Sequence, residues 1–390
     1  MKKSKKIGLG ILIPGVVLFL GFDFLALRSV EPSTDAEPEL VPFTLVEVDR
    51  NGPQDIWAKA AADMNNDGLK DLIVGGNAED TGGLVWYENP AWIRHGIDTE
   101  SRFGTDVELA DINGNGSLDA IAILADQKLA WYESPDWTQH LIGKGRLHDI
   151  EVADFDGDGQ IEIVGRNQGE FGQSGAKLFF YKRQASGSWD QLSFAIPEGE
   201  GLVASDLNGD DRLDIIVNET WYENTGTFLD EAAWREHVYT DSWTHKNSFV
   251  DVGDINGNGR PDIVLSPSEL AEEYYRISWL EAPADPTSGP WTEHVIDDYV
   301  EAVYHFIGLA DFNQNGRLDV ATAEMEQGED PDEVKLYLNP GNGNSWTKQV
   351  LYTGGSHSME IMDINNNGVP DLFGANWRGK EVLLWVNLKR

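Results

Sequence analysis

The chain has 390 residues, and its 67 acidic against 29 basic side chains give a formal net charge of −38, which excludes nucleic acid as a partner because phosphate is repelled. It contains no cysteine, which excludes disulfides, thiol catalysis, cysteine-bound zinc and a lipid anchor on cysteine. Forty-one Gly and 14 Trp favour many short strands joined by tight turns.

The N-terminus has the charge order of an export segment. Lysine occupies four of the first six positions, and an apolar run follows over 7–22. We expect 1–27 to be either a membrane anchor or a cleaved signal peptide, and 28–42 to be a flexible acidic and proline-containing linker. The protein is therefore expected outside the cytoplasm, periplasmic or on the cell surface, membrane-anchored or secreted, with this segment as its only membrane contact.

A nine-residue pattern, D-x-[ND]-x-[ND]-x-x-x-[DE], then recurs seven times along the chain. Its copies begin at Asp63, Asp111, Asp154, Asp206, Asp254, Asp311 and Asp363, spaced 43 to 57 residues apart. A strand pattern precedes each copy and a second follows it. A third carries Trp, and a fourth often has W-x-x-H. Four strands per repeat and seven repeats predict an all-β, seven-bladed β-propeller over 43–390.

The order of strands also predicts how the ring closes. The last repeat ends at its third strand, over 381–388, and the chain stops two residues later. Residues 43–48 have the pattern of the missing outer strand. We expect this N-terminal strand to pair with the C-terminal one, which removes a free sheet edge.

The acidic loops predict calcium sites. Oxygen side chains at loop positions 1, 3, 5 and 9, with a backbone carbonyl at position 7, make the hard ligand set that Ca²⁺ prefers. The predicted ligands are Asp63, Asn65, Asp67, Asp71, Asp111, Asn113, Asn115, Asp119, Asp154, Asp156, Asp158, Glu162, Asp206, Asn208, Asp210, Asp214, Asp254, Asn256, Asn258, Asp262, Asp311, Asn313, Asn315, Asp319, Asp363, Asn365, Asn367 and Asp371.

The seven loops differ in charge, and charge tunes calcium affinity. The third has four carboxylates at these positions and the first and fourth have three, so these loops should bind most firmly. The Asn-rich copies have an alternative, because Asx-turns can hold such a loop together without metal.

Several His and Trp residues fall outside the repeat pattern. His148, His305, His357 and Trp57 each stand six residues before a loop Asp, at the start of the predicted inner strand. The others outside the pattern are His245, Trp243 and Trp377. Strand alternation predicts that these residues converge on one mouth of the central channel, opposite the calcium loops.

Such a cluster predicts two kinds of chemistry. His148, His305 and His357 could hold Zn²⁺ or another divalent transition metal, with Tyr304 or His245 as a base. The Trp side chains could instead form a sugar platform. The predicted substrate-binding residues are Trp57, Trp243, Trp377, Arg166, Arg378 and Glu324. The plain alternative is that the channel histidines only bond the backbones of neighbouring blades.

The seven loops and their flanking strands resemble the FG-GAP/VCBS repeat family, whose loops also occur in integrin α-subunit propellers. Carbohydrate-active propellers, including polysaccharide lyases and the fungal aldos-2-ulose dehydratase, are more distantly similar. The resemblance implies a calcium-stabilised propeller and favours carbohydrate as the ligand. Two functions therefore stay open: a metal-dependent carbohydrate lyase or dehydratase, and a non-catalytic surface module that binds glycan or protein. A purely structural propeller is a third.

Overall fold

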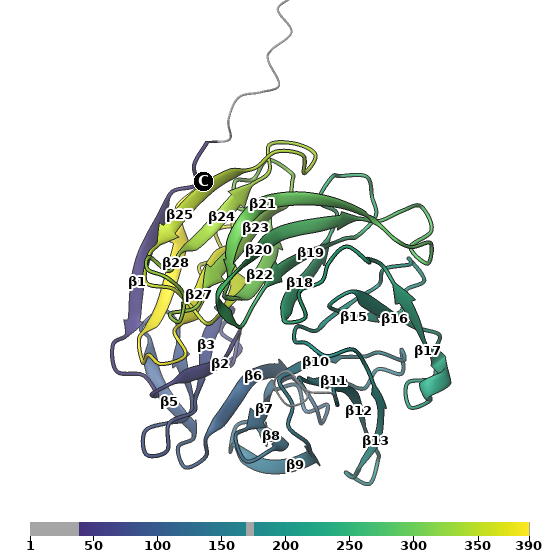
Figure 1. The fold of residues 1–390 in the computed structure, drawn as a ribbon. Helices are drawn as coiled ribbons and strands as arrows, with labels where there is room; N and C mark the ends of the chain where they lie inside the picture. Colours follow the sequence, from purple (N-terminus) through teal and green to yellow (C-terminus); the bar gives the residue numbers. More distant parts are fainter. Residues whose placement is uncertain (1–38, 169–174, 390) are drawn as a thin grey trace, which may run out of the picture. The chain divides into compact units, whose positions relative to one another are not determined.

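The computed structural model describes residues 39–168 and 175–389. The predicted export segment, and 28–38 of the predicted linker, lie outside these ranges. The described residues form seven four-stranded antiparallel sheets and one short 3₁₀ turn, η1 (Glu231–Ala233). The predicted seven-bladed propeller is confirmed (Figure 1). No helix within the described ranges is long and apolar enough to cross a membrane.

Each blade runs from an inner to an outer strand. The first three blades are β2 (Ile56–Ala62), β3 (Asp71–Gly76), β4 (Gly83–Glu88), β5 (Ile93–Asp98); β6 (Phe103–Ala110), β7 (Asp119–Leu124), β8 (Lys128–Glu133), β9 (Thr138–Lys144); and β10 (Asp149–Ala153), β11 (Glu162–Asn167), β12 (Lys177–Arg183), β13 (Trp189–Ala195).

The next three blades follow the same order. They are β14 (Val203–Ser205), β15 (Asp214–Val217), β16 (Thr220–Asn224), β17 (Trp234–Val238); β18 (Ser248–Gly253), β19 (Asp262–Pro267), β20 (Leu270–Glu281), β21 (Thr292–Ala302); and β22 (Tyr304–Ala310), β23 (Asp319–Glu324), β24 (Val334–Leu338), β25 (Thr347–Tyr352).

The seventh blade closes the ring as predicted. It consists of β26 (Ser358–Met362), β27 (Asp371–Ala375), β28 (Val382–Asn387) and, as outer strand, β1 (Phe43–Asp49). Figure 1 shows the purple β1 beside the yellow β28. The Gln349 amide of the sixth blade bonds both the N–H and the carbonyl of Val41, just before β1. The two ends of the propeller are thus joined by a full strand ladder.

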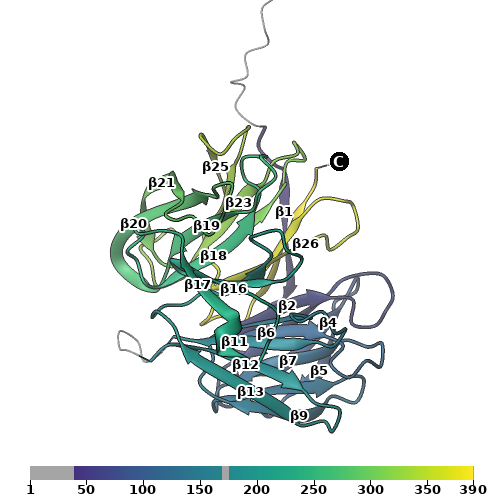
Figure 2. The ribbon, with the colours of Figure 1, turned by 90° about the vertical axis from the view of Figure 1, so that its right-hand side faces the viewer.

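The blades pack face to face through apolar side chains. The second strands are short runs rich in β-branched and aliphatic residues, and those of the second and fourth blades, β7 and β15, are wholly buried. Ile121, Leu129 and Trp131 of the second blade form one cluster with Ile163 and Tyr181 of the third; Figure 2 shows these two sheets one against the other. The first strands of six of the seven pairs of neighbouring blades contact each other, including β2 and β26 across the closure, so the first strands surround the central axis.

The W-x-x-H histidines pack within their own blades. His95, His140, His237 and His294 each stack on the third-strand Trp of their own blade, with ring centroids 4.2 to 4.5 Å apart. Each also bonds a third-strand Glu at 2.8 to 3.0 Å. These four histidines are therefore committed to the outer half of their blades.

Candidate functional site

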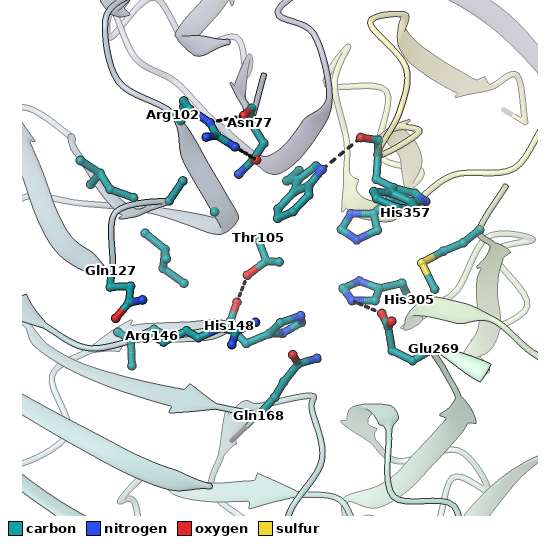
Figure 3. A pocket seen from close by; sticks show the side chains of 18 of the residues that line it. Asn77, Arg102, Thr105, Gln127, Arg146, His148, Gln168, Glu269, His305 and His357 are labelled. Carbon is teal, nitrogen blue, oxygen red and sulfur yellow. Dashed lines mark hydrogen bonds and ion pairs between the residues drawn. The ribbon is translucent and has the colours of Figure 1, made fainter. Parts of the chain in front are cut away.

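A cavity of about 480 Å³ lies at one mouth of the central channel (Figure 3). His148, His305 and His357 line it together with Trp57 and Trp377, so the structure brings these five predicted residues to one place. Their convergence has a simple cause. His148 and His357 directly precede β10 and β26, and His305 is the second residue of β22, so equivalent register places them at the same end of the channel.

The two indoles form one wall of the cavity. The Trp57 and Trp377 ring centroids are 6.1 Å apart with planes at 58°, and the Trp57 N–H donates to the Trp377 carbonyl at 3.0 Å. The Arg378 guanidinium lies 4.3 Å from the Trp377 ring, where it covers the indole and faces outward. The wall is therefore a fixed aromatic corner with a cation at its edge.

Polar side chains that the repeat pattern did not single out complete the lining. Asn77, Arg102, Gln127, Arg146 and Gln168 all border the cavity. Arg102 donates to the backbone and side-chain oxygens of Asn77, so these two side chains hold each other. The cavity thus combines apolar rings with amide and guanidinium groups.

A buried carboxylate organises the histidines. Glu200, wholly buried in the segment before β14, has its Oε2 atom 3.4 Å from Nε2 of both His148 and His305. Burial alone would raise the pKa of Glu200, but the nearby His305 and His148 together lower it. Glu200 occupies no repeat position, so the repeat pattern could not single it out.

The three histidines have different electrostatic environments. Burial disfavours a charged His305, but Glu200 and Glu269 outweigh burial and raise its pKa to about 9. Burial, reinforced by His305 and Lys59, instead lowers the pKa of His357 well below the ordinary value. The two rings stack at 4.1 Å. The His305 ring, with a raised pKa, and the His357 ring, with a lowered pKa, thus lie side by side at the cavity wall.

Several predicted residues lie elsewhere. Trp243 is buried and packs at right angles on Tyr275, and His245 bonds the Asn247 carbonyl, so neither borders the cavity. Tyr304 is buried, and its hydroxyl donates to Glu324, which also accepts from Lys335. The predicted roles of these residues at the mouth are therefore corrected: they pack and bond within and between blades.

Arg166 is the clearest correction. Its side chain is wholly buried, and its guanidinium donates to the carbonyls of Glu200 at 2.8 Å and Gly201 at 2.5 Å and to the Asn218 side chain. It cannot reach a ligand in the cavity. It instead holds the segment that carries Glu200, which makes Arg166 a positioning residue.

Below the cavity, the channel is lined with acids from different blades. Asp106 accepts from the Ile150 N–H at 2.9 Å, and Asp251 from the Leu309 N–H at 2.7 Å, so each bridges two neighbouring inner strands. Burial raises the pKa of Glu360 to about 8 and that of Asp106 to about 7. Asp106 and Asp251 thus bond the backbone of a neighbouring blade, which was the alternative role considered for the channel histidines.

The seven acidic loops share one geometry. The first Asp of each loop accepts the backbone N–H groups of positions 5 and 6, as Asp63 does from Asp67 and Gly68. The ninth residue is wholly buried in every loop. In the first loop this is Asp71, whose pKa burial raises although it accepts the N–H groups of Met64 and Asn89. The ligand set is all oxygen, so the loops fit a hard cation.

In the third loop, a lysine from a neighbouring strand contacts three of the carboxylates. The ammonium of Lys182, on β12, lies 2.7 Å from Asp158 and 2.9 Å from Glu162 and also bonds Asp156. In four other blades a Glu that pairs with a W-x-x-H histidine occupies the same register. Lys182 therefore offsets part of the charge of the four carboxylates on which the predicted calcium affinity of this loop depends.

Comparisons with known proteins agree with the repeat and the fold. Residues 277–374 match the family model described as an FG-GAP-like repeat. The protein is thus a seven-bladed propeller in which 277–374 are similar to an FG-GAP-like repeat, in agreement with the resemblance deduced from its loops. No curated protein matches the sequence.

Two solved structures are similar in fold. A chain of the mitotic checkpoint complex has a TM-score of 0.56 at 10% identity, over 96% of this chain and 99% of that one. The biofilm matrix protein Bap1 of V. cholerae has a TM-score of 0.47 at 12% identity, over 87% and 89% of the two chains. At these identities the first likeness shows the fold alone, and the second carries no argument.

Proposed function

We propose that this protein is an extracytoplasmic, calcium-binding propeller that binds carbohydrate in the cavity at its channel mouth. The observation that carries the proposal is the aromatic corner of Trp57 and Trp377 facing amide and guanidinium groups in one cavity. Sugar rings present apolar C–H faces, which pack on indole, and equatorial hydroxyls, which bond such polar groups. The lysine-led apolar N-terminus supports export.

Replacing Trp57 with alanine should weaken glycan binding at least tenfold, about 1.4 kcal/mol, because the indole face is lost. A glycan array identifies a ligand, and titration calorimetry then compares the variants. Trp189→Ala is the matched control, since Trp189 is half-buried on the outer strand β13, away from the cavity. Equal affinity of Trp57→Ala and the unmodified protein would remove the cavity as the binding site.

Catalysis is the second candidate, favoured by the stacked His305 and His357. The two rings stack at 4.1 Å at the cavity wall, so His357 can accept a proton from a ligand while His305, or an ion that it holds, stabilises the resulting anion. Removal of an α-proton from a uronate or ketosugar, followed by elimination, is the chemistry such a pair serves. Mass spectrometry of the bound glycan distinguishes the candidates, because a binding module returns it unchanged.

Calcium is the proposed ion of the acidic loops whose buried ninth residue has no lysine or arginine beside it. In the sixth loop, for example, burial raises the pKa of Asp319 to about 7, and no cation pairs with it among the described residues. A bound Ca²⁺ would neutralise such a carboxylate and fasten the inner strand to the next one. The third loop already has Lys182 in this place.

Replacing Lys182 with glutamate, the residue of four other blades, should create one additional calcium site. Loss of the ammonium leaves the carboxylates of Asp156, Asp158 and Glu162 to a metal. The calcium content after equilibrium dialysis should rise by about one equivalent. Lys177→Glu, exposed on the same strand, should leave it unchanged. An unchanged calcium content in Lys182→Glu would contradict the idea that the Lys182 ammonium occupies the place of a calcium ion.

A further inference from the structure

We propose that His148, His305 and Glu200 bind one divalent transition metal, of the zinc type, at the inner end of the cavity. The three residues come from the third blade, the sixth blade and the segment that enters the fourth, so only the closed ring brings them together. All three are buried. The site deepens the proposed function of the same cavity, but it stands on its own geometry and is tested without a sugar.

The spacing of the donor atoms suits a metal better than a hydrogen bond. The Oε2 atom of Glu200 lies 3.4 Å from Nε2 of His148 and 3.4 Å from Nε2 of His305. Ligand atoms about 2.0–2.1 Å from a tetrahedral metal are about 3.3–3.4 Å apart. One donor atom from each of the three residues lies within 4.8 Å of the others. Two of the three donor separations thus match those around a tetrahedral ion.

Unpartnered nitrogens provide a second, independent observation. His305 is only 3% exposed, yet neither of its ring nitrogens makes a hydrogen bond to any described residue. Buried polar groups are normally bonded, but Nε2 has only the carboxylate oxygens of Glu200 and Glu269, at 3.4 and 3.3 Å and outside hydrogen-bond geometry, an arrangement that suits an ion between these groups. The Oε1 atom of Glu269 lies 3.3 Å from the same Nε2 and can serve as a fourth ligand or as an acceptor for metal-bound water.

Surrounding side chains orient the donors as they do around metal sites. The carboxylate of Asp149 lies 3.0 Å from Nδ1 of His148, which leaves Nε2 to face Glu200. Glu200 accepts from Ser268 at 2.7 Å and from Gln168 at 2.6 Å. A carboxylate behind a histidine and hydrogen bonds to a ligating carboxylate fix ligand geometry before the metal arrives.

The ligand set differs from the three histidines expected at this mouth. His357 stacks on His305 with ring planes 19° apart, so it lies over that ring and is not among the grouped donors. Glu200 takes its place. Two imidazoles and one carboxylate suit Zn²⁺ and similar ions and leave a position open toward the cavity for an oxygen ligand.

The test measures metal in the whole protein. After a chelator wash and with excess Ca²⁺ to fill the loops, dialysis against Zn²⁺ should load about one equivalent. His305→Gln and His148→Gln should each weaken zinc binding at least about 100-fold, since each removes a ligand. His245→Gln, on a residue outside the cavity, should retain the full equivalent. Thermal denaturation of each variant in Ca²⁺ shows that it is folded.

Cobalt provides a second readout. Co²⁺ should give the visible absorption of a four- or five-coordinate site with nitrogen ligands, and this absorption should be absent from His305→Gln. An equal zinc content in the unmodified protein, His305→Gln and His148→Gln would overturn the proposal and leave a protonated His305 paired with Glu200. Glycan binding by a protein that takes up no zinc would overturn the metal site alone, whereas zinc uptake without glycan binding would overturn only the proposed function.

Discussion

Replacing Arg166 with methionine is expected to destabilise the propeller by about 3–5 kcal/mol, with a fall in Tm of roughly 5 °C or more. The guanidinium is wholly buried and donates to the Glu200 and Gly201 carbonyls and to Asn218. Methionine fills a similar volume but leaves these acceptors without a donor. Each unpaired buried acceptor then destabilises the folded state by its full desolvation penalty.

Thermal and chemical denaturation of purified protein measure the effect of Arg166→Met. The matched control is Arg378→Met, because the Arg378 side chain is 67% exposed and its loss should change stability by no more than about 0.5 kcal/mol. Comparing these two variants also distinguishes an arginine that stabilises the fold from one that lies exposed at the edge of the cavity. If Arg166→Met left stability unchanged, its guanidinium would not be the fixed support described here.

Replacing Glu360 with glutamine is expected to stabilise the propeller at alkaline pH and to have little effect near pH 4.5. Burial, with the charge of Asp106, raises the pKa of Glu360 to about 8, although Lys59 opposes the shift. The folded protein therefore holds this proton more tightly than the unfolded chain does. The resulting stabilisation is complete below about pH 4.5 and is lost as the pH rises through about 8.

The expected gain of Glu360→Gln is roughly 2–4 kcal/mol at pH 8.5, below the full value of the pKa shift because the channel admits some solvent. Urea denaturation at several pH values between 4.5 and 8.5 measures it. Glu236→Gln, exposed on β17, is the control and should follow the unmodified protein throughout. A constant difference between Glu360→Gln and the unmodified protein at all pH values would show that the carboxyl does not titrate in this range.

These predictions rest on residues that the sequence revealed to different degrees. Spacing and pattern were sufficient for the blades, because seven copies of one loop between strands of fixed order have few ways to fold. The pairing of β1 with β28 followed from a missing fourth strand. Register was also sufficient for His148, His305, His357 and Trp57, because equivalent positions of equivalent blades reach the same height along the axis.

Connecting segments were not predictable in this way. Glu200 and Glu269 lie outside the repeat register, and nothing in their local sequence indicates that they approach His305. Trp243 and His245 were expected at the mouth from their place in a connection, but that connection turns aside and packs on Tyr275. A position in a strand is fixed by the ladder, whereas a position in a connection depends on the neighbours it meets.

The sequence by itself determined the propeller, its closure and the row of channel-mouth histidines, because periodicity fixes how far along a strand, and on which side of it, a residue lies. Only the tertiary structure decided that Arg166 supports Glu200 from within the core and that the Lys182 ammonium enters the third loop. Both outcomes depend on which charged groups meet across strands and blades. Charges far apart in the chain become partners only where folding removes water between them.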